Sequence, residues 1–192
     1  VGTDTTWSTD IRKLSKGDSS TGAIKTDGTL WMWGNNGAYN DGKLMTNDRT
    51  DYSSPVQIGT GNDWKNISMG DRATLALKTT GSLWACGSNA YGVLGLNQVA
   101  YPIGSDTSTT KYSSPVQIPG TTWKNVSAGG YWFMATKTNG TLWMWGWENN
   151  SYGKLGQNDQ VKYSSPVQIP GTTWSDLAQG GDGRRTYAIK TD

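Results

Sequence analysis

The heptapeptide Tyr-Ser-Ser-Pro-Val-Gln-Ile occurs three times in the chain, at Tyr52–Ile58, Tyr112–Ile118 and Tyr163–Ile169. A catalytic motif is normally present once, whereas a string that recurs in order is typical of a structural unit that the chain builds repeatedly. We interpret its second part, Ser-Pro-Val-Gln-Ile, as a β-strand. The prolines Pro55, Pro115 and Pro166 would stand at the strand start, where a missing N–H costs least.

Other strings keep step with the heptapeptide. A tryptophan opens each unit, at Trp7, Trp64, Trp123 and Trp174. A tetrad of Gly, Thr or Ser, Leu and Trp follows, at Gly28–Trp31, Gly81–Trp84 and Gly140–Trp143. These marks predict a single repeat domain, residues 1–192, with repeats at about 7–63, 64–122 and 123–173 and a partial repeat at 174–192.

Each unit is predicted to contain four short strands. The turn between the second and third strands is centred on Asp27-Gly28, Thr80-Gly81 or Asn139-Gly140. Asp-Gly and Asn-Gly favour a two-residue hairpin of type I′, in which both central residues have positive φ. The turn glycines Gly28, Gly81 and Gly140 and the strand tryptophans Trp31, Trp84 and Trp143 are therefore predicted structural residues of the repeat.

The third strand indicates how the sheets pack. In Leu30-Trp31-Met32-Trp33, leucine and methionine point to one face and both tryptophans to the other, so both faces are apolar. An exposed antiparallel sheet would show one polar face. The pattern predicts an all-β fold in which four-stranded antiparallel blades stack face to face as a β-propeller, with an open solenoid of sheets as the alternative.

The composition narrows the chemistry. The chain of 192 residues has no histidine, one cysteine, eleven tryptophans and a formal charge of +2. The missing histidine removes the usual general base and the commonest metal ligand. One cysteine allows no disulfide within the chain and no thiolate zinc site. We expect no enzyme activity, no cofactor, no metal, no nucleic-acid partner and no membrane insertion.

The unit resembles the repeat of the regulator of chromosome condensation family. In that family, a Gly-x-Leu/Val-x-x-Trp-Gly-x-Asn strand is followed by Tyr-Gly-x-Leu-Gly and then Ser-Pro-Val. Matching segments here are Trp84–Asn89 with Tyr91–Gly95, and Trp143–Gly146 with Tyr152–Gly156. The first unit departs from this pattern at Tyr39–Leu44. The resemblance implies a propeller, typically of seven blades, that binds other proteins.

About three and a half repeats are present, and the last residues, Thr191-Asp192, match Thr26-Asp27 at the start of a hairpin turn. Because propellers usually need four to eight blades, we expect either a fragment of a longer polypeptide or one chain of a multi-chain ring. The style of the repeats resembles proteins of bacteria and their viruses.

Loops that differ between repeats are the candidate binding sites, since the repeated part is scaffold. The loop after Gly95 is longer than its counterpart and holds the apolar cluster Tyr101, Pro102 and Ile103. This cluster would contact a partner or fold back on its own blade. Trp147 is an added tryptophan that would anchor an interface, stack on a sugar or pack against a neighbouring blade.

Two further features have functional and structural interpretations. Arg184 and Arg185 form the only adjacent arginine pair and would bind carboxylates or phosphates, or remain solvated. Cys86 occupies the place of Trp33 and Trp145, which predicts a buried structural thiol that faces the next blade.

These observations predict a non-enzymatic propeller scaffold for protein or glycan recognition, located outside the cell or on a virion surface, with self-assembly as a further possibility. The alternatives are guanine-nucleotide exchange on a small GTPase, which the resemblance implies, and a secreted propeller that inhibits an enzyme.

Overall fold

The structure, a computed structural model, describes residues 5–36, 41–90, 92–98, 111–146, 153–178 and 187–192. In this part of the chain the only helical element is a short 3-10 helix, η1, at Ile11–Lys13. The strands form three four-stranded antiparallel sheets and one two-stranded sheet, which we number blades 1 to 4.

The strands of each blade follow one another in chain order. Blade 1 contains β1 (Leu14–Gly17), β2 (Ser20–Ile24), β3 (Leu30–Gly34) and β4 (Tyr52–Gln57). Blade 2 contains β5 (Trp64–Met69), β6 (Ala73–Lys78), β7 (Leu83–Ser88) and β8 (Lys111–Ile118). Blade 3 contains β9 (Trp123–Ala128), β10 (Trp132–Lys137), β11 (Leu142–Gly146) and β12 (Tyr163–Ile169). Blade 4 contains β13 (Trp174–Leu177) and β14 (Ala188–Lys190).

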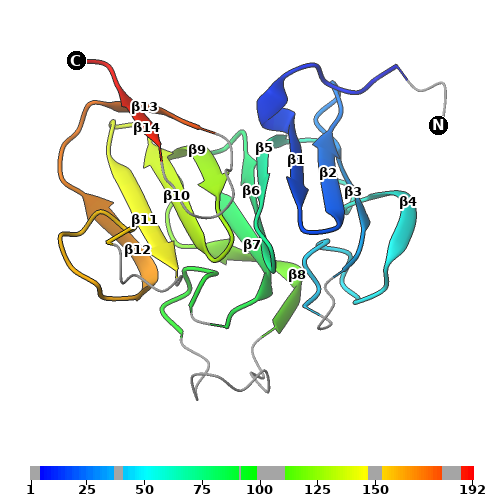
Figure 1. Cartoon of the computed structure of the whole chain (residues 1–192). Coiled ribbons are helices and arrows are strands. Elements are labelled where there is room, and N and C mark those ends of the chain that lie inside the picture. Colours follow the sequence, from blue (N-terminus) through cyan, green and yellow to red (C-terminus); the bar gives the residue numbers. More distant parts are fainter. Residues whose placement is uncertain (1–4, 37–40, 91, 99–110, 147–152, 179–186) are drawn as a thin grey trace.

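The blades are arranged side by side around their first strands (Figure 1). Strand β1 contacts β5, β5 contacts β9, and β9 contacts β13, whereas β4, β8 and β12 form the outer edges. This is the arrangement of consecutive propeller blades. The predicted all-β fold, with about three and a half propeller repeats, is confirmed.

Apolar side chains fill the space between consecutive blades, which we call joints. In joint 1/2, Leu30 and Met32 of β3 are fully buried and pack in one cluster with Ile67 of blade 2. Joint 2/3 is larger and includes Leu83, Phe133 and Trp145. Each buried side chain of this size contributes about 1.5–3 kcal/mol, so the joints hold the sheets in position.

The hairpin turns link each blade to the next. The carbonyl of Gly28 accepts a hydrogen bond of 3.1 Å from the backbone N–H of Trp64, and Gly81 and Gly140 do the same for Trp123 and Trp174. A Cβ on Gly28 would lie 1.9 Å from the carbonyl oxygen of Asn62. Glycine is therefore required here by the close approach of the next blade.

The predicted turn type is wrong. The N–H of Gly28 donates to the carbonyl of Lys25, and the N–H of Lys25 pairs with the carbonyl of Thr29. The loop thus has three residues, Thr26 to Gly28, of which only Gly28 has positive φ, at 85°. The carboxylate of Asp27 stabilises this loop by accepting from the N–H and hydroxyl of Thr29, so Asp27 needs no left-handed backbone.

The predicted position of the prolines is also wrong. Pro55, Pro115 and Pro166 lie inside β4, β8 and β12 rather than at their first residues. The register between β3 and β4 shifts next to the proline. Met32 pairs with Val56 and Gly34 pairs with Tyr52, so β4 has more residues between the two pairs than β3 has. The extra residues form a bulge on an outer strand, a site that tolerates a missing N–H.

Candidate interaction surface

The repeats expose two different faces (Figure 1). The hairpin face consists of the three-residue turns between the second and third strands of blades 1 to 3. The loop face consists of the turns between the first and second strands and the long connections between the third and fourth strands. The hairpins repeat closely, whereas the connections on the loop face differ in length and sequence.

The six predicted binding residues lie outside the described residues. In sequence, Tyr101, Pro102 and Ile103 fall between β7 and β8, Trp147 follows β11, and Arg184 and Arg185 fall between β13 and β14. Their roles stay predictions.

On the loop face, an asparagine organises the first part of each described connection. The side-chain oxygen of Asn36 accepts from the N–H of Leu44 at 2.8 Å, and Asn89 does the same for Leu94 at 3.1 Å. Both asparagines are fully buried. Leu44, at the end of the stretch that departs from the family pattern in sequence, thus keeps the hydrogen bond found in blade 2.

The left-handed residues of these connections also match. Gly42, Met45 and Asn47 have φ of 78°, 58° and 64°, and their counterparts Gly92, Gly95 and Asn97 have φ of 73°, 70° and 55°. The two connections therefore share one backbone shape with different side chains. Their shared shape identifies Asp41, the residue before Gly42, as the counterpart of Tyr91.

The repeated Tyr-Ser-Ser has two tasks. The Tyr52 hydroxyl donates to Asp48 at 2.7 Å, and this bond raises the pKa of Tyr52. Tyr112 donates instead to Gln98. The serine backbone meets the preceding blade, since the carbonyl of Ser113 accepts from the N–H of Asn47 and that of Ser164 accepts from the N–H of Asn97. The tyrosine of the heptapeptide therefore bonds to the connection of its own blade, and the first serine bonds to the connection of the preceding blade.

A buried lysine joins blades 1 and 2 at the loop face. Lys43 is 1% exposed, and its Nζ donates to the carbonyl of Asp18 at 2.6 Å and to that of Asp71 at 2.9 Å. These carbonyls belong to the turns between β1 and β2 and between β5 and β6. Burial lowers the pKa of Lys43, because the charged form loses solvation.

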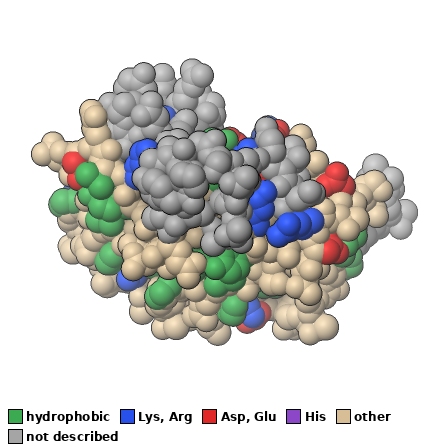
Figure 2. Space-filling view, turned by 90° about the horizontal axis from the view of Figure 1, so that it is seen from below, with side chains coloured by type: hydrophobic (Ala, Val, Ile, Leu, Met, Phe, Trp, Pro, Cys, Tyr) green, Lys and Arg blue, Asp and Glu red, His purple; other side chains and the backbone are tan. Residues whose placement is uncertain are grey.

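A buried carboxylate lies close by in the sequence. Asp41 is 1% exposed, with Oδ1 3.4 Å from Lys111 Nζ and Oδ2 3.9 Å from Arg72 Nε. Within the described part of the chain, neither oxygen has a hydrogen-bond partner. Asp41 therefore holds two partly exposed cations of blade 2, one from the turn between β5 and β6 and one from the start of β8. Both basic and acidic side chains are visible on the side of the molecule seen in Figure 2.

The hairpin face carries a lysine between two tryptophans. The Lys25 ammonium lies 4.9 Å from the ring centre of Trp7 and 4.2 Å from that of Trp31. Lys137 lies in the same way between Trp123 and Trp143. Such cation–π contacts stabilise the edge of each sheet by about 0.5–1 kcal/mol at an exposed site.

The strand tryptophans are also fixed by hydrogen bonds. The Nε1 of Trp31 donates to Thr29, that of Trp84 to Ser82 and that of Trp143 to Thr141. The repeated Gly-Thr/Ser-Leu-Trp tetrad therefore links a turn to an indole, which is a structural task.

Cys86 is buried, as expected, and its environment raises the pKa of the thiol through desolvation. Its predicted direction is wrong. Cys86 packs with Leu44 and Met45, so it faces the preceding blade rather than the next one. The direction follows from its Sγ, which donates to the carbonyl of Lys43 at 3.1 Å.

The described residues meet the requirements of neither a metal site nor a membrane-spanning helix. They contain no group of three or more His, Cys, Asp or Glu residues that would hold a metal ion. They also contain no helix with the length and apolarity of a membrane span.

Comparison with known proteins agrees with the repeat geometry. Profiles described as the regulator of chromosome condensation (RCC1) repeat match residues 64–93, 80–135 and 139–182. The chain belongs to the RCC1 repeat family. It is 29% identical over 164 residues to the ultraviolet-B receptor UVR8 of Arabidopsis thaliana, covering 83% of this chain and 34% of that protein.

Other similar proteins share the fold. The chain is 28% identical to the protein RCC2 homolog of Xenopus laevis, covering 82% of this chain and 29% of that protein. Prp20p of Saccharomyces cerevisiae superimposes with a TM-score of 0.71 at 20% identity, covering 93% of this chain and 44% of Prp20p. Human WBSCR16 gives 0.68 at 20% identity, with coverage of 93% and 44%. The chain spans about a third of the length of UVR8 and of the RCC2 homolog.

Proposed function

We propose that the chain is part of a non-enzymatic propeller that recognises other proteins through its loop face. The observation that carries this proposal is the contrast within that face. The connections of blades 1 and 2 share their left-handed turns, but the partly exposed Thr46 and Asp48 of one blade are replaced by Leu96 and Gln98 in the other. A fixed backbone with variable side chains is typical of a recognition surface.

The partners of similar proteins support the proposal that this chain binds proteins. Prp20p binds Gsp1p and histones, and yeast RCC1 has been crystallised with Kap60 bound to it. In this chain, Arg72 and Lys111 are held against Asp41 on the loop face. A partner with acidic groups is complementary to such a surface, because opposite charges steer association and set its orientation.

The test places a photo-crosslinking residue at one exposed position of each face in the intact protein. Arg49 reports on the loop face and Thr80 on the hairpin face. We expect a discrete crosslinked product from position 49 in an extract of the source organism, and none from position 80. The variant Arg72→Ala/Lys111→Ala should reduce the product severalfold. Equal products from both faces, or none from position 49, would overturn the proposal.

The composition supports a location outside the cell or on a virion surface, since Ser, Thr, Asn and Gly are abundant and the repeats are nearly identical. Quantitative mass spectrometry of purified particles, the extracellular fraction and the cell interior tests this part. Enrichment inside the cell would contradict it.

A glycan array with Trp147→Ala as control tests sugar binding, and native mass measurement tests self-assembly.

Guanine-nucleotide exchange is the second candidate. It is favoured by a relative at 30% identity over 158 residues, the X-linked retinitis pigmentosa GTPase regulator of Mus musculus, of which the match covers 15%. Release of labelled GDP from a panel of small GTPases measures this activity. An acceleration that requires the loop face would replace the scaffold proposal with this one.

A further inference from the structure

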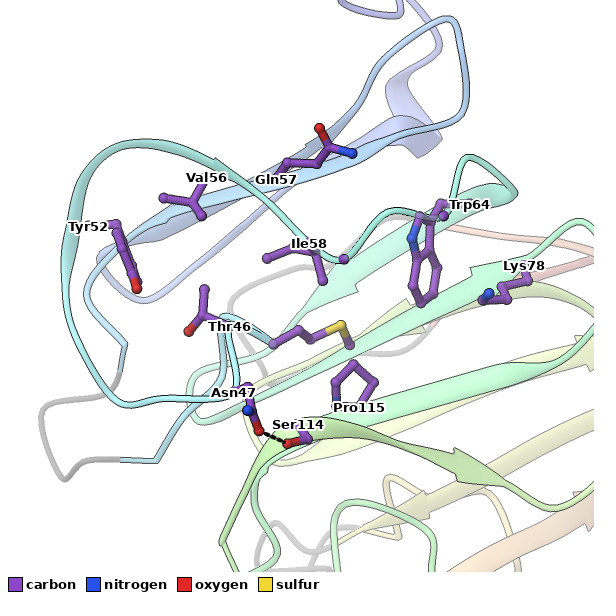
Figure 3. A pocket seen from close by; sticks show the side chains of 13 residues that line it. Thr46, Asn47, Tyr52, Val56, Gln57, Ile58, Trp64, Lys78, Ser114 and Pro115 are labelled. Atoms are coloured by element: carbon purple, nitrogen blue, oxygen red, sulfur yellow. Dashed lines mark hydrogen bonds between the residues drawn. The ribbon is translucent and has the colours of Figure 1, made fainter.

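A cavity of about 500 Å³ lies between blades 1 and 2, beside the outer strand β4 of one and β8 of the other (Figure 3). Its walls include the apolar side chains of Met45, Val56, Ile58 and Pro115. The indole of Trp64 lies at one end of the cavity in Figure 3. The lining also includes the polar side chains of Thr46, Asn47, Tyr52, Gln57, Lys78 and Ser114. A space of this size that combines apolar walls with a set of polar groups has the character of a ligand site.

The one enclosed donor at this end has no acceptor. Trp64 is 6% exposed, and within the described part of the chain its Nε1 has no hydrogen-bond partner. In the next joint, the equivalent Trp123 donates to the carbonyl of Pro119 at 3.3 Å. The Nε1 of Trp174 also lacks an acceptor, but Trp64 is the one of these two tryptophans that lines the cavity. A buried N–H without an acceptor is a cost that a bound acceptor removes.

The segment next to this donor is rich in glycine. The connection from Ile58 to Trp64 is one residue longer than the connection from Ile118 to Trp123, and it contains Gly59 and Gly61. A Cβ on Gly61 would lie 4.0 Å from Trp64 Nε1, whereas one on Gly59 would meet nothing within 4 Å. Because Nε1 is enclosed in this arrangement, the proposed acceptor reaches it only if this connection moves aside.

The charges near Trp64 select against an anion. Lys78 lines the cavity and lies 4.9 Å from the Trp64 ring centre, but its Nζ is 3.0 Å from Asp63 Oδ1. The ammonium is thus already paired, and a carboxylate on the ligand would meet the negative charge of Asp63. An uncharged carbonyl accepts the indole N–H without that repulsion.

We propose that this cavity binds an apolar side chain of a partner polypeptide, with an uncharged backbone carbonyl accepting from Trp64 Nε1. The assignment to a polypeptide rests on the proposed role in protein recognition, whereas the preference for an apolar group with a neutral acceptor rests on the cavity. The cavity is lined in part by Met45, Thr46 and Asn47 of the loop-face connection, but none of Asp41, Lys43, Arg72 and Lys111 lines it.

The test uses the intact protein labelled with ¹⁵N in its tryptophan indoles, with N-acetyl-L-leucine methylamide as the probe. Trp64→Phe assigns the Trp64 resonance. We expect a saturable downfield shift of that resonance at millimolar probe, and an unchanged Trp123 resonance. Binding to Trp64→Phe, which lacks that resonance, is followed at the backbone amide resonances of uniformly ¹⁵N-labelled protein, and it should be about tenfold weaker, as the loss of one hydrogen bond predicts. The charged probe N-acetyl-L-leucine should bind more weakly.

Gly61→Leu fills the space beside Nε1, and Thr121→Leu, at the counterpart of the neighbouring residue Asn62, is the control substitution in the next connection. The Trp123 resonance reports whether both variants remain folded. We expect Gly61→Leu to abolish the shift and Thr121→Leu to leave it intact. No shift in the wild type, equal binding of the charged probe, or binding that survives Gly61→Leu would each overturn the site. If the Trp64 resonance responds to the probe but position 49 gives no crosslink, the cavity is a binding site and the proposal that the loop face recognises proteins is wrong.

Discussion

Joints 1/2 and 2/3 contain an equivalent contact, in which a side chain of one blade donates to a backbone carbonyl of the preceding blade. The side chains that make this contact differ between the two joints. In joint 2/3, the indole of Trp145 donates to the carbonyl of Val93 at 3.0 Å and lies over Gly95, where a Cβ would come within 2.8 Å of Nε1. In joint 1/2, Cys86 donates to the carbonyl of Lys43, and the methionine Met45 replaces the glycine.

The two joints therefore share a hydrogen-bond donor and a filled volume rather than a residue type. A large side chain over glycine and a small one beside methionine are two solutions to the same packing problem. The second solution places Met45 at φ of 58°, which costs about 1 kcal/mol or more for a residue other than glycine. The cavity beside Met45 lies in the same joint.

The largest expected effect is that of Trp145→Ala. Trp145 is fully buried, so the truncation leaves a cavity and an unpaired Val93 carbonyl, and we expect a loss of about 3–5 kcal/mol in the free energy of unfolding. Trp33→Ala is the matched control, since Trp33 is only partly buried and should cost less. Denaturant unfolding measures both losses. Equal losses would show that the two positions are packed alike.

Lys43→Met tests the part of joint 1/2 that has no counterpart in joint 2/3, where Val93 takes this place. Methionine keeps the length of the chain but leaves the carbonyls of Asp18 and Asp71 without the ammonium. We expect a loss of about 1–3 kcal/mol, because the unpaired carbonyls outweigh the relief of a buried charge. A neutral or stabilising result would show that desolvation dominates.

The stability of the wild type relative to Lys43→Met should depend on pH, because burial lowers the pKa of Lys43. Between the folded pKa and the ordinary value of 10.5, the unfolded state binds more protons, so stability rises with pH. The difference in unfolding free energy between wild type and Lys43→Met should therefore grow as pH rises toward 10.5. A difference that shrinks over this range would contradict the assigned burial effect.

The side chains of joint 2/3 can be transferred to joint 1/2. Cys86→Trp alone overpacks against Met45 and should cost about 1–3 kcal/mol. Adding Met45→Gly reproduces the pair found in joint 2/3, so we expect a favourable coupling of about 1–3 kcal/mol between the two substitutions. A double-mutant cycle measures this coupling. Simple additivity would mean that the two joints differ in backbone as well as side chains.

The repeats made the fold predictable, because strand faces and turn glycines are visible as recurring letters. The turn type failed at Asp27, since the dipeptide does not reveal that Lys25 pairs with Thr29 and adds a loop residue. The direction of Cys86 failed because alternation along a strand separates two faces without saying which neighbour each face meets.

The ionic residues of the loop face were missed for a related reason. Lys43 is surrounded by carbonyls from turns 25 and 28 residues away in sequence, and no local pattern shows them. One signal was available in the departure of Tyr39–Leu44 from the family pattern, where Asp41 replaces a tyrosine. The sequence marked the place of the change but not the partners Arg72 and Lys111.

The smallest expected effect on stability, and the sharpest on chemistry, concerns the thiol of Cys86. Its desolvation raises the pKa, so at pH 8 the nucleophilic thiolate is rarer than in an exposed cysteine, and burial blocks reagent as well. We expect labelling by iodoacetamide to be at least a hundredfold slower in the native protein than in denaturant. Because Cys86 is the only cysteine, intact mass gives the rate directly. Rapid native labelling would mean that joint 1/2 opens on its own, and the packing contrast with joint 2/3 would then be a contrast in dynamics.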